Sequence, residues 1–213
     1  YHALKDTENF IKTINKALLI ALILGFPACL GLILLSKELI ITLFQYGEFS
    51  LDSAIKTSLS LQAYGSGLMA FIAIKIFAPV FLSRGDTKTP VKAGIVAMVS
   101  NIILNLILVQ FYGHIGLAAA TSLSALLNAS ILYFYLIKQS IFKFDAAFYK
   151  MLTRVIFAVT LMSSYIMFFD TNIEAYFDSS IFDRCWLLFK SIAISASIYF
   201  LSLFVFRVRF KDL

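Results

Sequence analysis

Charged residues are scarce in this chain of 213 residues, where they make up 14% against about 25% in an average soluble domain. Proline and glycine are also rare, at 3 and 9 residues, which excludes a loop-rich fold. The two cysteines, Cys29 and Cys185, lie inside or at the edge of apolar runs, so the sequence gives no support for a disulfide framework. The chain lacks the polar surface that a soluble protein of this length needs.

Apolar residues are correspondingly more abundant than in soluble proteins. They account for 61% of the chain, against about 45–50% in globular proteins, and the mean hydropathy is +0.89. Phenylalanine alone contributes 22 residues and tyrosine another 10. The apolar runs are about 20 residues long, which suits membrane-spanning helices rather than the shorter strands of a barrel. We therefore predict an integral membrane protein of the all-α class.

Six stretches are long and apolar enough to cross a bilayer as helices. They are Ala17–Phe44, Leu59–Leu82, Val91–Phe111, Ile115–Ile137, Met151–Phe169 and Trp186–Phe206. A tight turn at Gly113 separates the third and fourth stretches, so these two are expected to be adjacent and antiparallel. Thr89 is predicted to be the N-cap of the third helix, with Pro90 at its first position. The predicted fold is a polytopic bundle of six spans.

Basic residues are distributed unevenly about these spans. Thirteen of the 18 Lys and Arg residues fall at one end of the predicted bundle and four at the other, with Lys75 inside a span. The positive-inside rule then predicts that both termini are cytoplasmic. The net charge of +6 is explained in this way, and nucleic acid is not an expected partner. The amphipathic segment Tyr1–Lys16 is expected to lie at the inner interface and to contact membrane lipids. Aromatic residues among the lysines of 138–150 suit either a segment resting on anionic lipid or a solvated loop.

Polar residues inside a span are costly, so function is best sought among them. Lys75 is predicted to lie about 12 Å from the inner loop, at 1.5 Å per residue. Its ammonium group either extends back to the cytoplasmic interface or faces a central cavity, where it attracts an anionic substrate. Tyr64, the nearby glycines and Pro79 predict an irregular helix, which favours the cavity.

Two polar stripes are expected on the third and fourth spans. Asn101 and Asn105 are four residues apart and share one face of their helix, while Thr121, Ser124 and Asn128 share one face of the next. Because the two helices are predicted to be neighbours, the stripes can meet. Hydrogen bonding between helices, at about 1 kcal/mol each, is the commoner role for such residues, and a polar cavity is the alternative. No paired carboxylates, Cys/His metal spacing or Gly-rich phosphate loop is present in the spans, so catalysis is not expected.

The most specific motif runs from Lys75 through Lys92. It combines K-x-x-A-P-x-F with the loop R-x-D-x-K-T-P-V-K, and this stretch resembles the lipid II flippase family (MurJ, also called MviN). Phe44–Phe49 is similar to the motif that follows the family's ninth helix, and the segment from Leu126 to Tyr133 is similar to its twelfth helix. Family members have fourteen helices, so the resemblance implies that these six are the ninth to the fourteenth. We accordingly expect the chain to be the C-terminal piece of a longer protein.

The resemblance also implies a function. It places the chain in the multidrug/oligosaccharidyl-lipid/polysaccharide exporter superfamily, whose two lobes rock around a central cavity in alternating access. Residues 1–140 would carry the last four helices of the C-terminal lobe, and residues 141–213 the two extra helices that form a lipid-tail groove. The implied partner is lipid II, an undecaprenyl-pyrophosphate carrying a disaccharide-pentapeptide, and the implied location is the bacterial inner membrane. The full-length protein is expected to act as a monomer.

The resemblance suggests site residues as well. Lys75, Tyr64 and Asn128 are the candidates for substrate binding. Some family members bind sodium, and the matching positions here are Asn101, Asn105, the Leu117 carbonyl and Thr121. These residues include no carboxylate, which argues against a sodium site built from them alone. No organic cofactor is expected; the driving force would be sodium or the membrane potential.

Three competing functions stay open at this point. Two belong to the same superfamily: a flippase for another undecaprenyl-linked oligosaccharide and a cation-coupled drug exporter. The third is a non-transporting membrane scaffold for cell-wall enzymes. The loop motif argues against the first two, and complementation of flippase depletion would separate these two from the lipid II flippase.

Overall fold

The computed structural model describes residues 2–139, 146–168 and 173–206. Within these ranges the chain forms eight helices and no strand, which confirms the predicted all-α class. The helices are α1 (His2–Leu34), α2 (Ser36–Phe44), α3 (Leu51–Ser83), α4 (Lys88–Tyr112), α5 (His114–Lys138), α6 (Ala146–Phe168), α7 (Ile173–Asp178) and α8 (Ile181–Val205).

Six of these helices carry stretches long and apolar enough to cross a membrane, so the predicted number of spans is confirmed. The stretches are Ile11–Leu34, Leu51–Ser83, Lys88–Tyr112, His114–Lys138, Phe148–Phe168 and Ile181–Val205. The predicted turn at Gly113 is also confirmed. Gly113 has φ +55°, a conformation that residues with a side chain rarely adopt, and it reverses the chain between α4 and α5.

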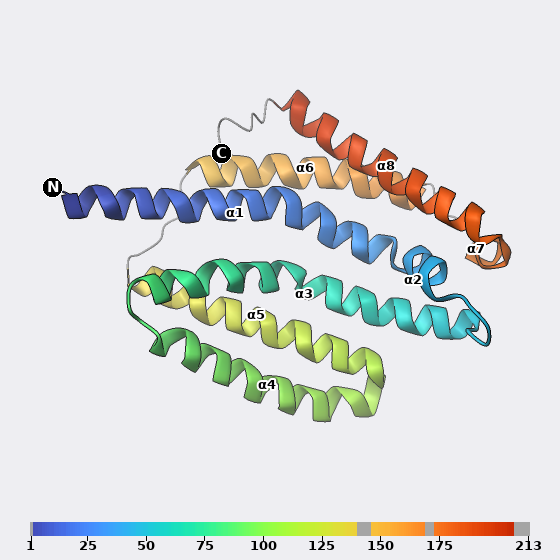
Figure 1. The fold of residues 1–213 in the computed structure, drawn as a ribbon, viewed down its shortest axis with the longest axis horizontal. Helices are drawn as coiled ribbons and strands as arrows, with labels where there is room; N and C mark the ends of the chain where they lie inside the picture. Colours follow the sequence, from blue (N-terminus) through green and yellow to red (C-terminus); the bar gives the residue numbers. More distant parts are fainter. Residues whose placement is uncertain (1, 140–145, 169–172, 207–213) are drawn as a thin grey trace.

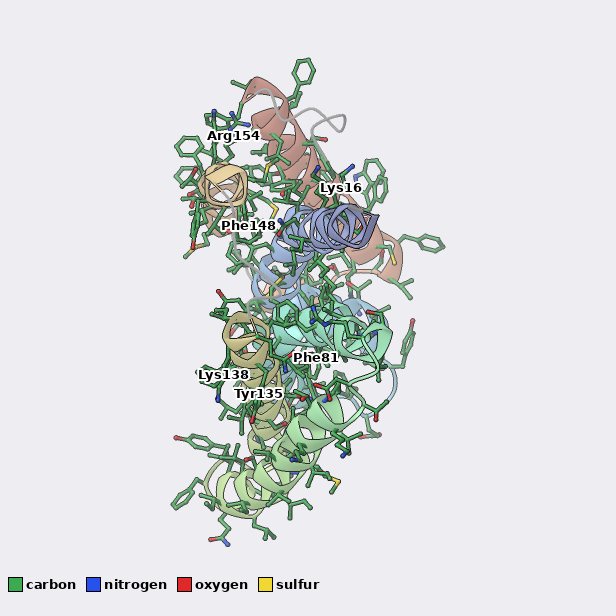
Figure 2. The ribbon with its side chains drawn as sticks, turned by 90° about the vertical axis from the view of Figure 1, so that its left-hand side faces the viewer. Lys16, Phe81, Tyr135, Lys138, Phe148 and Arg154 are labelled. Atoms are coloured by element: carbon green, nitrogen blue, oxygen red, sulfur yellow. The ribbon has the colours of Figure 1, made fainter. Side chains whose placement is uncertain are left out.

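The long helices alternate in direction along the bundle (Figure 1). The start of α1, the α3–α4 turn, the last turn of α5 and the start of α6 lie at one end, which we call the basic end. Figure 2 shows this end, with Lys16 of α1, Lys138 of α5 and Arg154 of α6 spread across it. The opposite end, which we call the far end, carries α2, α7 and the α4–α5 turn. The cytoplasmic location of the basic end stays a prediction.

The spanning helices pack in a row. α4 lies against α5, α5 against α3, α3 against α1, α1 against α6, and α6 against α8. The row is elongated when it is viewed from the basic end (Figure 2). α4, at one end of the row, buries only Ala93 and Ala97, so most of its apolar surface is exposed.

Two clusters of large side chains form the core between the helices. The first joins α1, α3, α4 and α5 and comprises Ile14, Leu18, Phe77, Val80, Phe81, Ala93, Leu132 and Leu136. The second joins α1, α6 and α8 and comprises Leu19, Leu22, Ile23, Met151, Val155, Ala158, Val159, Met162, Tyr199 and Leu203. Phe148 packs against both clusters and therefore connects the two halves of the row.

The first predicted span, Ala17–Phe44, is wrong as a continuous helix. α1 ends at Leu34, and α2 begins at Ser36 after a break at Leu35, which has φ −94° and ψ 16°. Ser36 is fully buried and accepts a hydrogen bond of 2.8 Å from the Gln62 side chain of α3. Such tertiary contacts override the local apolar pattern, which does not reveal the break.

The predicted N-cap of the third span is also wrong. α4 begins at Lys88, so Thr89 and Pro90 lie inside its first turn. The Asp86 carboxylate accepts hydrogen bonds from the Thr89 amide at 3.0 Å and from the Thr89 hydroxyl at 2.6 Å, and it thus caps the helix instead. Pro90 is tolerated because the first helical amides need no partner within the helix. These hydrogen bonds, from the Thr89 side chain first and its amide second, lower the pKa of Asp86 below its ordinary value.

Other expected segments lie partly outside the described residues. The link 138–150 includes 140–145, which are not described, and α6 already begins at Ala146. From residue 2 onward the expected lead-in Tyr1–Lys16 forms the start of α1, which runs without interruption into the first span. Its position at the inner interface stays a prediction. The expected link 170–184 contains the short helix α7 and the first turn of α8.

Candidate functional site

The two polar stripes meet as the sequence predicts. The Asn105 side-chain amide donates to the Asn101 side-chain oxygen at 3.0 Å along α4. The Asn101 amide in turn donates to the Ser124 hydroxyl of α5 at 3.2 Å. α4 and α5 can approach this closely because Gly116 packs directly against the Leu108 backbone carbonyl. The hydrogen-bonded stripe therefore joins the two helices.

An open pocket of about 340 Å³ lies beside this stripe, and we call it the amide pocket. α3, α4 and α5 all contribute to it, and its lining is Phe71, Ile74, Ala97, Met98, Asn101, Thr121, Ser124, Ala125 and Asn128. The side-chain oxygen of Asn128 is buried without a hydrogen-bond partner among the described residues. A buried polar atom without a partner is costly, so it is an available acceptor for a polar ligand or water at this pocket.

The structure places Lys75 and Tyr64 next to the amide pocket but not in its lining. Both are exposed residues of α3. Phe71, which lines the pocket, follows Tyr64 by seven residues and precedes Lys75 by four, so all three share one face of the helix. The candidates Asn101, Thr121 and Asn128 are thus brought together at the pocket, while Tyr64 and Lys75 flank it along α3.

The expected irregularity of α3 is not seen. The helix is continuous from Leu51 to Ser83, with Pro79 inside it. Its glycines serve close packing, because a Cβ added at Gly67 would come within 2.8 Å of the Ser122 backbone. The Ser122 hydroxyl donates to the Ala63 carbonyl oxygen at 2.6 Å, across the same contact. Gly65 allows a similar approach of α1, because a Cβ added there would come within 2.9 Å of the Ile33 side chain, and the Cys29 thiol donates to the Gly65 carbonyl oxygen at 3.0 Å.

The candidate sodium positions are partly engaged in hydrogen bonds with one another, while the side-chain oxygen of Asn105 is buried without a partner among the described residues. The Thr121 hydroxyl donates to the Leu117 carbonyl oxygen at 2.9 Å, and the Asn101 oxygen is occupied by the Asn105 amide. In the ranges 2–139, 146–168 and 173–206, no group of three or more His, Cys, Asp or Glu residues could hold a metal ion. A hard cation prefers charged oxygen ligands, which this set of neutral groups does not supply.

A groove of about 320 Å³ runs between α1, α6 and α8. We call it the apolar groove; its lining is Leu24, Pro27, Ala28, Gly31, Leu32, Leu35, Leu39, Met162, Ile192, Ser195, Ala196, Tyr199 and Phe200. The Tyr199 hydroxyl is not free in the groove, because it donates to the Ile23 carbonyl oxygen at 2.6 Å. Ser195 also lies in this lining, and its hydroxyl donates to the Ile192 carbonyl oxygen at 3.0 Å.

Lys37 and Glu38 were missed as candidate residues. They lie in the first turn of α2 and line a second pocket of about 340 Å³, at the far end of the bundle. The signal is present in the sequence, since a Lys-Glu pair interrupts the predicted span Ala17–Phe44. An ionisable residue inside such a run is a candidate for function by default.

These features define the class of the protein. Six apolar spanning helices, a hydrogen-bonded polar stripe and a polar pocket between helices are the features of a multi-pass membrane protein. The family model described as "Lipid II flippase MurJ" matches residues 1–186. The chain belongs to the lipid II flippase MurJ family.

Individual relatives agree with this assignment. A Vibrio cholerae protein named "Probable lipid II flippase MurJ" is 38% identical over all of this chain, and one of the same name from Haemophilus influenzae is 35% identical over 96% of it. A solved structure described as "Lipid II flippase MurJ, inward closed conformation" is 27% identical and covers 95% of the chain with a TM-score of 0.78. The chain spans about 40% of the length of each of these three proteins.

Proposed function

We propose that this chain is part of a flippase that moves lipid II from the cytoplasmic to the outer leaflet of the bacterial inner membrane by alternating access. The observation that supports this most strongly is the family match, which covers residues 1–186. The amide pocket supports it independently, because it offers polar groups between helices that are apolar enough to span a membrane. The activity we propose is transport, in keeping with a family of flippases, and not catalysis.

The physical task explains why such a pocket is needed. A sugar–peptide–pyrophosphate headgroup cannot enter hydrocarbon unaided, since each unsatisfied polar group costs several kcal/mol. Asn101, Thr121 and Asn128 would replace part of the water that the headgroup loses. An inside-negative potential would favour the outward movement of an anion by about 2.3 kcal/mol per charge per 100 mV.

Lys75 and Tyr64 would act at the edge of this pocket. The lysine ammonium would attract the pyrophosphate, and the exposed tyrosine, on the same face of α3, would contact the headgroup farther along the helix. The lipid tail would stay in an apolar environment while the headgroup crosses. The apolar groove between α1, α6 and α8 suits that part of the substrate, in line with the proposed division of the chain into residues 1–140 and 141–213.

The test uses the full-length protein in cells depleted of their own lipid II flippase. We expect Lys75→Ala to fail to restore growth and Lys75→Arg to restore it at least partly, because the arginine keeps the positive charge. Lys56→Ala is the matched control, since Lys56 is an exposed lysine of the same helix that pairs with Asp52 at 2.6 Å. Normal lipid II flipping by a folded Lys75→Ala protein would show that the lysine has no role in transport.

Complementation also separates the proposed function from its competitors. A flippase for another lipid-linked oligosaccharide, a drug exporter or a non-transporting scaffold would not restore lipid II flipping to depleted cells. Failure of the unaltered full-length protein, when it is expressed and folded in the membrane, would therefore overturn the proposal as a whole.

A further inference from the structure

Proline occurs in the interior of two spanning helices, at Pro27 of α1 and at Pro79 of α3. A proline has no backbone N–H, so it cannot donate to the carbonyl oxygen four residues earlier in its helix. Pro27 therefore leaves the Ile23 carbonyl oxygen without its usual partner, and Pro79 leaves that of Lys75 in the same position. Inside a membrane, a carbonyl freed in this way is costly unless another group donates to it.

The carbonyl that Pro27 frees is the one that Tyr199 contacts. The Tyr199 hydroxyl, which comes from α8, donates to the Ile23 carbonyl oxygen at 2.6 Å, and the tyrosine is only 1% exposed. By contrast, no side chain of the residues that the structure describes donates to the carbonyl oxygen of Lys75. A donor at an interior proline is thus a specific contact between α1 and α8 and not a general feature of the bundle.

This hydrogen bond lies where close packing between α1 and α8 gives way to the apolar groove. Toward the basic end, Leu22 of α1 and Leu203 of α8 both belong to the second core cluster. Toward the far end, α1 lines the groove as far as Leu35, and α8 lines it as far as Ile192. α1 also changes direction on its way to α2 (Figure 1), as a helix with an interior proline is expected to do.

The two walls of the groove are held differently beyond Pro27. α1 is fastened to α3 on its other side, where the Cys29 thiol donates to the Gly65 carbonyl oxygen. On the groove side, Gly31 is part of the lining, and a Cβ added there meets nothing within 4 Å. No direct packing at Gly31 therefore sets the spacing of the walls. The bond from Tyr199 sets it instead, by fixing the position of α8 relative to α1 at one end of the groove.

We propose that Tyr199 is a positioning residue for the lipid chain, because its hydroxyl completes the hydrogen bonding of α1 at Pro27 and so holds the walls of the apolar groove at the spacing that admits the tail of lipid II. The proposal rests on the function proposed above, in which the groove receives this tail. A groove whose walls are already in place binds a chain more tightly, since the cost of ordering them is not paid on binding. The hydroxyl carries this effect, and the ring only fills space.

A double-mutant cycle tests whether the hydroxyl acts through the proline. Tyr199→Phe should lower the unfolding temperature of the full-length protein in detergent. Pro27→Ala restores a helical donor to the Ile23 carbonyl oxygen, so Tyr199→Phe should lose most of its effect in that background. Pro79→Ala is the matched control, because it removes the other interior proline and should leave the effect of Tyr199→Phe unchanged. Equal effects of Tyr199→Phe in all three backgrounds would overturn the proposal.

Lipid binding separates a positioning role from a purely structural one. Lipid II and an analogue with the same headgroup, but with a tail too short to enter the groove, are compared by native mass spectrometry at a temperature where the variants are folded. We expect Tyr199→Phe to weaken the binding of lipid II by up to about fivefold, the factor that one neutral hydrogen bond is worth, and to leave the binding of the analogue unchanged. The same loss for both lipids, or no loss for lipid II, would overturn the positioning role.

The two proposals fail in different ways. The unfolding temperatures test the contact between Tyr199 and Pro27 without any lipid II. Complementation by the unaltered full-length protein tests transport without any substitution in the groove. A failure of complementation therefore counts against the proposed function, whereas equal effects of Tyr199→Phe in the three backgrounds count against the role of Tyr199 alone.

Discussion

The two halves of the helix row are held together in different ways. Between α3 and α5, and between α4 and α5, the backbones themselves are in contact, at Gly67 against Ser122 and at Gly116 against Leu108. Between α1, α6 and α8 the contacts are made by large side chains such as Val155, and one buried hydroxyl adds a hydrogen bond. The first half closes tightly, while the second half leaves an apolar groove of about 320 Å³.

This difference shows how packing relates to function in a membrane bundle. Lipid surrounds the helices and is as apolar as their side chains, so small residues and hydrogen bonds do much of the work of association. A contact between backbones cannot adapt to an added atom, whereas a contact between long side chains can rearrange and admit a lipid chain. We call the half formed by α3, α4 and α5 the tight half and the half formed by α1, α6 and α8 the adaptable half. The hydrogen-bonded polar stripe lies in the tight half, and the apolar groove lies in the adaptable half.

The largest loss of stability is expected from adding a side chain at the close contact between α3 and α5. In Gly67→Ala, the new Cβ would lie 2.6–2.8 Å from the side-chain and backbone atoms of Ser122, and α3 and α5 would have to separate. We expect the protein to lose about 2–3 kcal/mol of stability, as overpacked sites do, and to unfold at a lower temperature. The measurement is thermal unfolding of the purified full-length protein in detergent.

Gly94→Ala is the control for this prediction. Gly94 is also a helical glycine, but a Cβ added there meets nothing within 4 Å. The substitution should be neutral or slightly stabilising, since alanine favours the helix by up to about 1 kcal/mol. Equal effects of the two substitutions would mean that the α3–α5 contact is not as close as the structure shows.

A smaller effect is expected in the adaptable half. Tyr199→Phe removes the hydroxyl that donates to the Ile23 carbonyl oxygen and keeps the ring in its buried position. The loss should be about 1 kcal/mol, because the bond is a single neutral one. Thermal unfolding under the same conditions checks this, with Tyr112→Phe as the exposed counterpart. A loss as large as that of Gly67→Ala would contradict the distinction between the two halves.

The sequence was informative where a pattern extends over a whole helix. The six spans follow from long apolar runs, and the meeting of the Asn101 and Thr121 stripes follows from helical spacing and a short turn. The same spacing places Asn101, Thr121, Ser124 and Asn128 together, and these residues line the amide pocket. Both results depend on local periodicity, which a single sequence carries.

The remaining features depend on contacts between distant segments. The break at Leu35 coincides with the burial of Ser36 against Gln62 and with the contact of Thr42 with Tyr176, more than 100 residues away. Without those partners the apolar run continues through α2, and Lys37 and Glu38 fall inside the predicted span Ala17–Phe44. The cap of α4 was misplaced because Asp86, Thr87 and Thr89 can all act as caps, and only the geometry of the turn selects Asp86.

The smallest predicted effect concerns that cap, in the tight half. The pKa of the Asp86 carboxylate is lowered by the Thr89 hydroxyl and amide, so its folded pKa lies below that of the unfolded chain. A group of this kind stabilises the protein above the unfolded pKa of about 4, and the contribution is lost as the pH falls through the folded pKa. We therefore expect Asp86→Asn to lower the unfolding temperature slightly at pH 7, and the difference from the unaltered protein to shrink in the acid range below pH 4.

Thr89→Val removes one donor and should produce part of the same change. A difference that stays constant from pH 7 to pH 3 would show that the carboxylate charge does not stabilise this turn, which would leave the backbone contacts at Gly67 and Gly116 to account for the tight half.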